Sequence, residues 1–432
     1  MLKTIQYFLL SLLAIVLILL IWLLSPPLWK RWVTYPALDK KVAEFQKLRK
    51  ETPGYEGKNL YEGHFHLHSY WSHDSEALLA DIIPAAKKHN VDFLFLSDHP
   101  RGASDHFPRG YQGYYDGVLI EPGSERKGLN VWPLRSDTLN WQMEADSIVK
   151  YVVENGGLVI YSHTEEPHSW DNPWYQGMEI YNFHTDTKDE SYRPIIANFL
   201  INGNKFRRWA YREIFDEQTN ILKLWDGINQ KRKVVGVGAI DTHENQNFRA
   251  RKLADGRIEW LGPNAKPIDT VAVSWKNRWL FSEPDASGWV FKLMIDTYET
   301  GFHYLSNYLF TDTLSVPSIV DGFNKGHLYT AFKSLGDARG FMYHAGHYDG
   351  TIAAIMGDSI RTTEINQLQA IAPLPGEFRI IHNGNEVGRS DAGVYEYTYQ
   401  GSLSPGVWRM EVHVNATGKT TPWVYSNPIY LY

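Results

Sequence analysis

Residues 63–74 read GHFHLHSYWSHD and place histidines at positions 64, 66 and 68. Alternate residues of a β-strand point to one face, so these three imidazoles would line up about 7 Å apart. A row of that kind can bind a metal ion. Taken alone, the stretch is explained equally well by a polar strand face or by one catalytic histidine with unrelated neighbours. The rest of the chain has to decide.

Four apolar runs of the chain end in histidine or in an aspartate-histidine combination. The runs are KNLYEGHFHLH, VDFLFLSDH, GGLVIYSH and KVVGVGAIDTH, and helical stretches alternate with them. Such alternation is typical of an α/β fold with parallel strands. The residues at the ends of these runs, in chain order, are His66 and His68, Asp98 and His99, His163, and Asp241 and His243.

These endings predict a metal site. In an α/β barrel the carboxyl ends of all strands gather at one face, where ligands from distant sequence positions meet. A single histidine at a strand end is more often a hydrogen-bonded structural residue, but four such endings in one chain favour coordination. Zinc, manganese and iron all accept imidazole and carboxylate ligands.

The composition narrows the classes of partner. The chain has 432 residues, which suggests two or three domains, and a net charge of −6. No block rich in Lys and Arg is present, so the sequence gives no sign of nucleic-acid binding. The absence of cysteine excludes disulfides and thiolate zinc sites and leaves His, Asp and Glu as metal ligands.

The N-terminus contains an apolar run, IQYFLLSLLAIVLILLIWLL, over residues 5–24. Its length matches a hydrocarbon layer of about 30 Å. We expect residues 1–24 to be an uncleaved single-pass membrane anchor and residues 25–58 to be a juxtamembrane stalk. Lys30 and Arg31 after the run favour a cytoplasmic body by the positive-inside rule. N-terminal anchors tend to export the chain that follows them, which favours an extracytoplasmic body. We therefore expect a periplasmic body and leave the cytoplasmic orientation open.

At residues 59–326 the sequence resembles the polymerase and histidinol phosphatase (PHP) superfamily of metal-dependent phosphoesterases. The motif H-x-H-[TS]-x-x-S appears as HLHSYWS at residues 66–72, and the next expected ligand falls on Asp74. The T/S-D-H motif appears at residues 97–99, G-x-E at residues 123–125, a strand ending in a histidine at His163, and D-x-H at residues 241–243.

The resemblance implies a distorted (β/α)7 barrel over residues 59–326 and hydrolysis of a phosphate ester by metal-activated water. It implies two or three divalent ions and catalytic roles for Asp74, His99 and Asp241. Arg101 and Arg126 would bind the phosphate, although a surface ion pair is the commoner role of an isolated arginine. The metal ligands that the resemblance implies are His66, His68, Asp74, His99, Glu125, His163, Asp241 and His243.

The chain also departs from the family pattern. A further histidine usually follows the motif glutamate, whereas residues 126–130 read RKGLN. One metal position could therefore be altered. His64 lies one strand step below the motif pair and is expected behind the ligands, as are Glu179 and Asn182 on a later strand. No role is assigned to His73, His168 and His184.

From residue 327 the chain changes to short alternating runs separated by Gly, Pro and Asn, among them GEFRIIHNG and GVWRMEVHVNATG. This pattern predicts a β-sandwich over residues 327–432. Binding of an envelope component and simple packing against the barrel are equally compatible with it.

The sequence supports two functions. The first is a membrane-anchored metal-dependent phosphoesterase acting on a phosphate ester. The second is a binding or scaffold protein of the cell envelope whose PHP-like barrel has lost turnover. Retention of the acidic residues and histidines of every motif favours the enzyme. The sequence names neither the substrate nor the oligomeric state.

Overall fold

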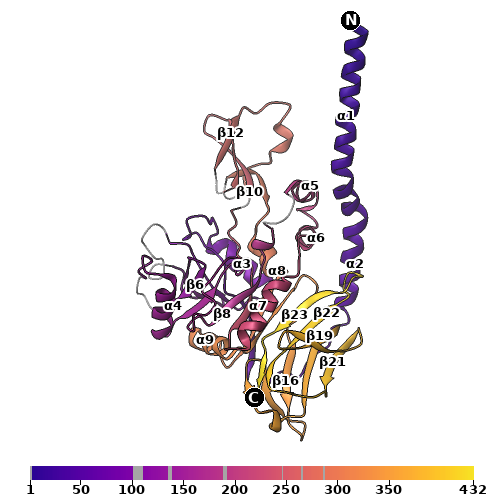
Figure 1. The fold of residues 1–432 in the computed structure, drawn as a ribbon. Coiled ribbons are helices and arrows are strands. Elements are labelled where there is room, and N and C mark those ends of the chain that lie inside the picture. Colours follow the sequence, from indigo (N-terminus) through magenta and orange to yellow (C-terminus); the bar gives the residue numbers. More distant parts are fainter. Residues whose placement is uncertain are drawn as a thin grey trace.

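The chain forms a mixed α/β protein in a computed structural model that describes residues 2–100, 110–134, 139–187, 192–245, 247–263, 266–285 and 288–432 (Figure 1). Strands among these residues form sheets of 15, 5 and 4 strands. A helical rod at the N-terminus stands apart from the sheets over much of its length (Figure 1). Seven further α-helices are described: α3 (Leu79–Lys88), α4 (Ala145–Glu154), α5 (Tyr192–Asn202), α6 (Arg207–Arg212), α7 (Thr219–Asn229), α8 (Tyr298–Tyr304) and α9 (Val316–Lys325).

The N-terminal rod consists of α1 (Leu2–Trp29), the π-helix η1 (Lys30–Thr34) and α2 (Tyr35–Gln46). Leu and Ile dominate α1, and its apolar side chains are exposed, Ile18 to 65% and Trp22 to 74%. By length and composition this helix is able to cross a membrane. The helix continues through much of the expected stalk to Gln46.

The lower part of the rod is fixed to the body. Lys30 Nζ lies 2.6 Å from Glu213 Oε2, and Arg31 Nη1 donates to the carbonyl of Ile201 at 2.5 Å. Tyr35 and Val42 of α2 are buried. The direction of the rod is therefore set by side-chain contacts with α5, α6 and the residues just after α6.

The first part of the large sheet contains the strand on which the quoted histidines begin. β1 pairs in parallel with β2 and antiparallel with β14, and β2 pairs in parallel with β4. Gly63 in β1 is required by packing, because a Cβ there would lie 2.5 Å from the ring of Phe93. The strands of this part are β1 (Asn59–His64), β2 (Phe93–Phe95), β3 (Gly113–Tyr115), β4 (Val118–Glu121) and β14 (Ser306–Thr311).

The five-stranded sheet supplies the remaining strand ends. β5, β6 and β7 pair antiparallel, whereas β7, β8 and β9 are parallel. The parallel strands are buried along their whole length, as their apolar sequences predict. The strands are β5 (Ser124–Arg126), β6 (Leu129–Trp132), β7 (Leu158–Tyr161), β8 (Gly177–Asn182) and β9 (Val235–Ala239).

Backbone hydrogen bonds join the two sheets where β1 and β9 end. The amide of Asp241 donates to the carbonyl of His66 at 3.0 Å, and the amide of His68 donates to the carbonyl of Thr242 at 3.0 Å. An aromatic core that includes Phe65, Phe93, Phe95 and Trp132 lies between the sheets. α9 covers it with Phe323, whose ring lies 5.0 Å from that of Phe65. These contacts bring the carboxyl ends of strands from both sheets to one place.

The C-terminal part is built from strands. The large sheet runs on from β14 through β15 to β23 and β22, so it crosses residue 327 without a break. β19 pairs with β16 and β21 in its first half and with β22 and β20 in its second half. The strands are β15 (Leu328–Ala331), β16 (Met342–Gly346), β17 (Ile352–Ile355), β18 (Ser359–Ile360), β19 (Gln367–His382), β20 (Asn385–Arg389), β21 (Val394–Tyr399), β22 (Gly406–Val414), β23 (Thr421–Ser426) and β24 (Ile429–Leu431).

The four-stranded sheet forms an arm, residues 247–294, that projects from the body on the same side as the N-terminal rod (Figure 1). It contains a small core of its own around Ala250, Ile258 and Val290. Its strands are β10 (Asn247–Lys252), β11 (Ile258–Leu261), β12 (Pro267–Val271) and β13 (Trp289–Met294), with a short 3-10 helix, η4 (Arg278–Leu280), between the last two.

Candidate metal centre

Eight side chains from four strand ends, from strand β5 and from one loop meet in a single cluster. His66 and His68 follow β1, His99 follows β2, and Glu125 lies in β5. The others come from the ends of β7 and β9 and from the loop after β1. The cluster consists of His66, His68, Asp74, His99, Glu125, His163, Asp241 and His243, and it includes every residue that the sequence analysis named as a ligand.

The first group within the cluster consists of His66, His68, Glu125 and Asp241. His66 Nε2 lies 3.1 Å from both Glu125 Oε2 and Asp241 Oδ1. His68 Nε2 lies 3.3 Å and 3.2 Å from the same two oxygens. All four side chains are buried. One ion at the centre of these atoms would have two nitrogen and two oxygen ligands.

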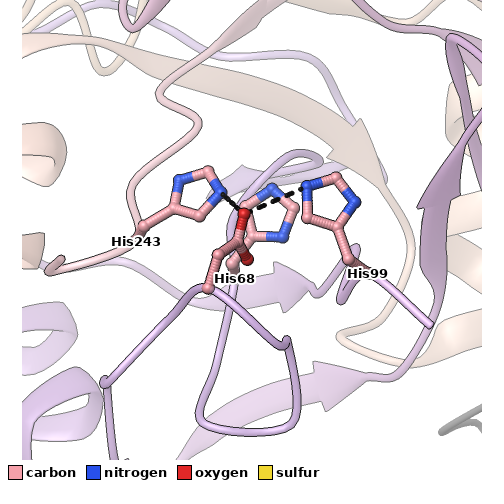
Figure 2. A group of neighbouring side chains, drawn as sticks. His68, His99 and His243 are labelled. Carbon is pink, nitrogen blue, oxygen red and sulfur yellow. Dashed lines mark ion pairs between the residues drawn. The ribbon is translucent and has the colours of Figure 1, made fainter. Parts of the chain in front are cut away.

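The second group consists of His68, Asp74, His99 and His243. Asp74 Oδ2 lies 3.5 Å from Nε2 of both His99 and His243. Figure 2 shows these ion pairs as dashed lines, with the ring of His68 between the other two imidazoles. The rings of His68 and His243 are stacked with centroids 3.9 Å apart. His68 belongs to both groups, so the two candidate positions are adjacent.

His163 approaches the first group from the end of β7. Its Nε2 lies 3.0 Å from Glu125 Oε1 and 3.6 Å from Asp241 Oδ2. Those are the oxygens that face away from His68. His163 therefore lies beside the first group, on the side away from His68.

The imidazole orientations are fixed from behind. Nδ1 of His99 and of His243 donates to the carbonyls of Glu125 and Asp241, at 2.9 and 3.0 Å. Nδ1 of His66 lies 2.5 Å from Glu179 Oε1. In each ring the hydrogen bond at Nδ1 leaves Nε2 facing the centre, which is how proteins orient metal-binding histidines.

Glu179 is the main support of the cluster, in line with the expected place of this residue behind the ligands. Besides the His66 ring it accepts hydrogen bonds from the amide of His163 and from Asn182 Nδ2, both at 2.9 Å. Asn130 Nδ2 donates to it at 3.3 Å. Asn130 stands opposite Glu125 in the β5–β6 register, within the segment where the family pattern has a histidine.

The electrostatics of the cluster favour bound positive charge. Burial raises the pKa of Glu125 and of Asp241, but the surrounding imidazoles overcome this and hold both well below their usual range. Burial lowers the pKa of His68, whereas the adjacent carboxylates of Asp241 and Glu125 raise it to about 9. Burial also lowers the pKa of His163, but Glu125 and Glu165 raise it to about 11. Divalent cations would take the place of these protons.

Two buried atoms test whether a metal fits. His68 Nε2 and Asp241 Oδ1 are 3.2 Å apart, yet neither has a hydrogen-bond partner. Buried polar atoms without partners are costly in a folded protein. Both atoms belong to the first group and both are ligand types that zinc and manganese accept. The residues present therefore fit divalent metal ions.

The backbone is strained at two of the cluster residues. His163 has a φ of 50° and Asp241 a φ of 48°, in the left-handed region that residues with a Cβ rarely adopt. Such a conformation costs about 1 kcal/mol or more for each residue. The sharp turns that result direct both side chains from their strand ends into the cluster.

The sequence analysis named two arginines, Arg101 and Arg126, as phosphate-binding residues. Arg101 lies outside the described residues. Arg126 is exposed and follows Glu125 in β5, so strand alternation directs its side chain to the opposite face. Phosphate binding by either arginine stays a prediction.

His64 and the three unassigned histidines surround the cluster. His64 is buried below it with its ring 4.8 Å from that of Phe302. His73 and His184 lie with their rings 5.3 Å from His99 and 5.7 Å from His243. Asp296, which no motif indicated, accepts hydrogen bonds from the amides of His243 and Glu244 at 2.8 Å each.

A cavity of about 700 Å³ lies beside the loop that leaves His163. His168 in its wall has Nε2 3.2 Å from the carbonyl of His163. Trp170, Trp174 and Lys150 also line it. None of the eight cluster residues lines this cavity.

No family model and no curated protein matches this chain. Among solved structures it is similar to a two-domain protein from Bacteroides vulgatus containing a predicted PHP-like metal-dependent phosphoesterase. The identity is 11%, the match covers 88% of this chain and 98% of that chain, and the TM-score is 0.36. A likeness of this strength carries no argument about this chain, so its function is argued from its own side chains.

Proposed function

We propose that this protein is a metal-dependent phosphoesterase that hydrolyses a phosphate ester with two or three bound divalent ions, zinc, manganese or iron. The observation that carries the proposal is the meeting of imidazole nitrogens and carboxylates in two adjacent groups that share His68. Paired metal positions of this kind are typical of enzymes that cleave phosphate esters. A structural metal site would not need a second position beside it.

The cluster residues would have different roles in the reaction. Divalent ions held here would polarise a phosphoryl oxygen and lower the pKa of bound water. Glu125 and Asp241 face four imidazoles each, so they are suited to bridge neighbouring positions. Asp74 and His99 lie at the more exposed end of the cluster, with side chains 27% and 25% exposed. In our proposal these two and Asp241 contact the reacting phosphate and water.

A serine nucleophile is not part of the proposal. Ser69 Oγ donates to Asp98 Oδ2 at 2.8 Å, and Ser72 Oγ donates to Asp74 Oδ1 at 2.6 Å. These hydrogen bonds shape the loop that carries Asp74. Nucleophilic catalysis by serine requires a basic nitrogen next to the hydroxyl. In these hydrogen bonds the partner of each hydroxyl is a carboxylate instead.

For the architecture, we propose that residues 59–326 form a distorted (β/α)7 barrel and residues 327–432 a β-sandwich. The hydrogen bonds between residues 66–68 and 241–242 support closure of the first. The change of partners along β19 supports the second, because strands that pass between two packed sheets are common in sandwiches.

We also propose that α1 anchors the protein in a membrane with the body on the extracytoplasmic side. The exposed apolar surface of this helix supports the anchor. The full chain is expected to sediment with membranes and to resist carbonate extraction. Protease added outside spheroplasts should digest the body, whereas digestion only after lysis would reverse the orientation.

The enzyme proposal is tested by Asp241→Ala. Purified protein should contain divalent metal and hydrolyse an activated phosphate ester, lose this activity to a chelator and regain it with manganese or zinc. Asp241→Ala should lower kcat by more than about 100-fold, because loss of a supporting residue alone costs about 10–100-fold. Asp391→Ala, on the exposed surface of the C-terminal part, is the matched control. Metal-loaded protein that cleaves no ester of a broad panel would instead favour the scaffold function.

A further inference from the structure

The arm and the membrane helix project on the same side of the body. In Figure 1 the arm extends in the same direction as α1 and reaches the level of the apolar part of that helix. If α1 crosses a bilayer, the bilayer surface therefore meets the arm. The outer end of the arm contains β12, η4 and the segment between them.

The outer end of the arm exposes large apolar side chains. Trp275 and Trp279 are 77% and 75% exposed, and Ile268 and Val273 are 58% and 47% exposed. Neighbouring apolar residues exposed to this degree mark an interaction surface. Tryptophan in particular is enriched where proteins meet the membrane–water interface.

The charge of the arm differs in sign from that of the whole protein. Residues 247–294 contain eight Lys and Arg and five Asp and Glu, whereas the chain has a net charge of −6. Lys266, Lys276 and Arg278 are exposed beside the apolar side chains. Basic residues near a bilayer surface attract anionic headgroups by about 1 kcal/mol each.

One short helix fixes both the rod and the base of the arm. In α6, Trp209 Nε1 donates to Asp39 Oδ1 in the rod at 2.7 Å, and Arg208 pairs with the same carboxylate. From the same helix, Arg207 Nη2 donates to the carbonyl of Met294 at the end of the arm at 3.0 Å. The arm and the rod are therefore held in one relative orientation.

We propose that the outer end of the arm is a second membrane contact, which binds the headgroup region of the bilayer crossed by α1. The contact residues are Ile268, Val273, Trp275 and Trp279, with Lys266, Lys276 and Arg278 on anionic headgroups. This inference rests on the proposed membrane anchor but not on the proposed hydrolysis. The competing possibility is that a second copy of the chain covers this surface. In that case the surface would be in contact with neither lipid nor water.

The chain offers a direct test because it contains no cysteine. Single variants of the full chain, Val273→Cys and Val387→Cys, are labelled with a nitroxide in vesicles of phosphatidylcholine and phosphatidylglycerol. The two valines are similarly exposed, to 47% and 40%, but Val387 lies in β20 of the C-terminal part. The accessibility of each label to oxygen and to a water-soluble nickel chelate is measured. The label at position 273 should be several times more accessible to oxygen than to the nickel chelate, as expected for a label in lipid. The label at position 387 should be more accessible to the nickel chelate than to oxygen, as expected for a label in water.

A third label, at Trp22→Cys in α1, separates failure of the inference from failure of the anchor. A lipid signal at position 22 with a water signal at position 273 would overturn the arm contact and keep the anchor. Protection at position 273 from both reagents would assign this surface to a second copy and also overturn the proposal. A water signal at position 22 would overturn the anchor. In that case a lipid signal at position 273 would still support the arm contact, and a water signal there would overturn it.

Discussion

Glu179 sets the direction of the His66 imidazole from behind. A neutral glutamine of the same shape would keep an acceptor near His66 Nδ1 but remove the negative charge that makes the ring a stronger ligand. Glu179→Gln is therefore expected to weaken metal affinity by about 10–100-fold. Competition with a fluorescent chelator measures the change.

The matched control is Glu377→Gln. Glu377 lies in β19 and pairs with Arg379 at 2.6 Å, far along the chain from every cluster residue. Its substitution should leave metal affinity unchanged. Equal affinity for wild type and Glu179→Gln would mean that His66 does not bind the metal through Nε2.

At the scale of residues, the sequence predicted much of the cluster. Six of the eight side chains follow strands that are readable from apolar runs, whereas Asp74 and Glu125 were named only from the family resemblance. Asp296 was not predicted. It acts through the amides of His243 and Glu244 from more than 50 residues away, and only the return of the arm brings it there.

α3 and α8 meet through two histidines that the fold keeps neutral. The rings of His89 and His303 lie 5.3 Å apart. Burial, together with Arg208, His89, Lys333 and Lys88, lowers the pKa of His303 to about 3. Burial and the nearby Lys333 and Lys88 lower the pKa of His89 to about 4, against the opposing effect of Glu299.

These depressed values predict sensitivity to acid. In the unfolded chain each histidine protonates near pH 6.5, so stability that is present above this pH is lost as the pH falls toward the folded pKa. For His303 the loss at pH 5 is about 2 kcal/mol. His303→Gln should remove it, and urea unfolding at pH 7 and pH 5 measures the difference. His347→Gln, on the half-exposed surface, should keep the full wild-type loss, and an identical loss in His303→Gln would contradict the assignment.

At the scale of elements, apolar runs predicted the strands that carry ligands, but not the arm. Residues 247–294 bury only a small core around Ala250, Ile258 and Val290. Because so few of their side chains are buried, their sequence shows little regular alternation of apolar and polar residues. The run GEFRIIHNG predicted only the second half of β19, whose backbone continues through Pro373 and Pro375 as one strand that changes partners.

A buried arginine connects the two halves of the molecule. Arg409 in β22 donates to Asp226 in α7 at 2.7 and 2.9 Å and lies 2.5 Å from Glu411. Burial alone would lower its pKa, but the two carboxylates raise it. Arg409→Met would leave these carboxylates without their partner, so the free energy of unfolding should fall by about 3–5 kcal/mol.

Arg389→Met is the control for this prediction. Arg389 pairs with Glu386 at 2.8 Å, but its side chain is 45% exposed. Exposed pairs of this kind contribute about 0–1 kcal/mol. Urea denaturation of both variants measures the difference, and losses of equal size would mean that the Arg409 contacts do not connect the two halves.

At the scale of the molecule, the sequence does not indicate how the strand-rich C-terminal part joins the rest. The change near residue 327 marks a change in local pattern. Strand pairing across that point depends on which edges meet in space. β15 lies between β14 and β23, a relation that no local pattern encodes.

The position of β15 constrains how this protein can change over generations. A gene shortened near codon 326 would encode a chain whose β14 has lost its neighbour, with unpaired amides and carbonyls along one edge. Edges of that kind recruit other chains and aggregate. A shortened descendant would aggregate, so we expect the part that carries the His/Asp/Glu cluster and the strand-rich part to be inherited as a unit.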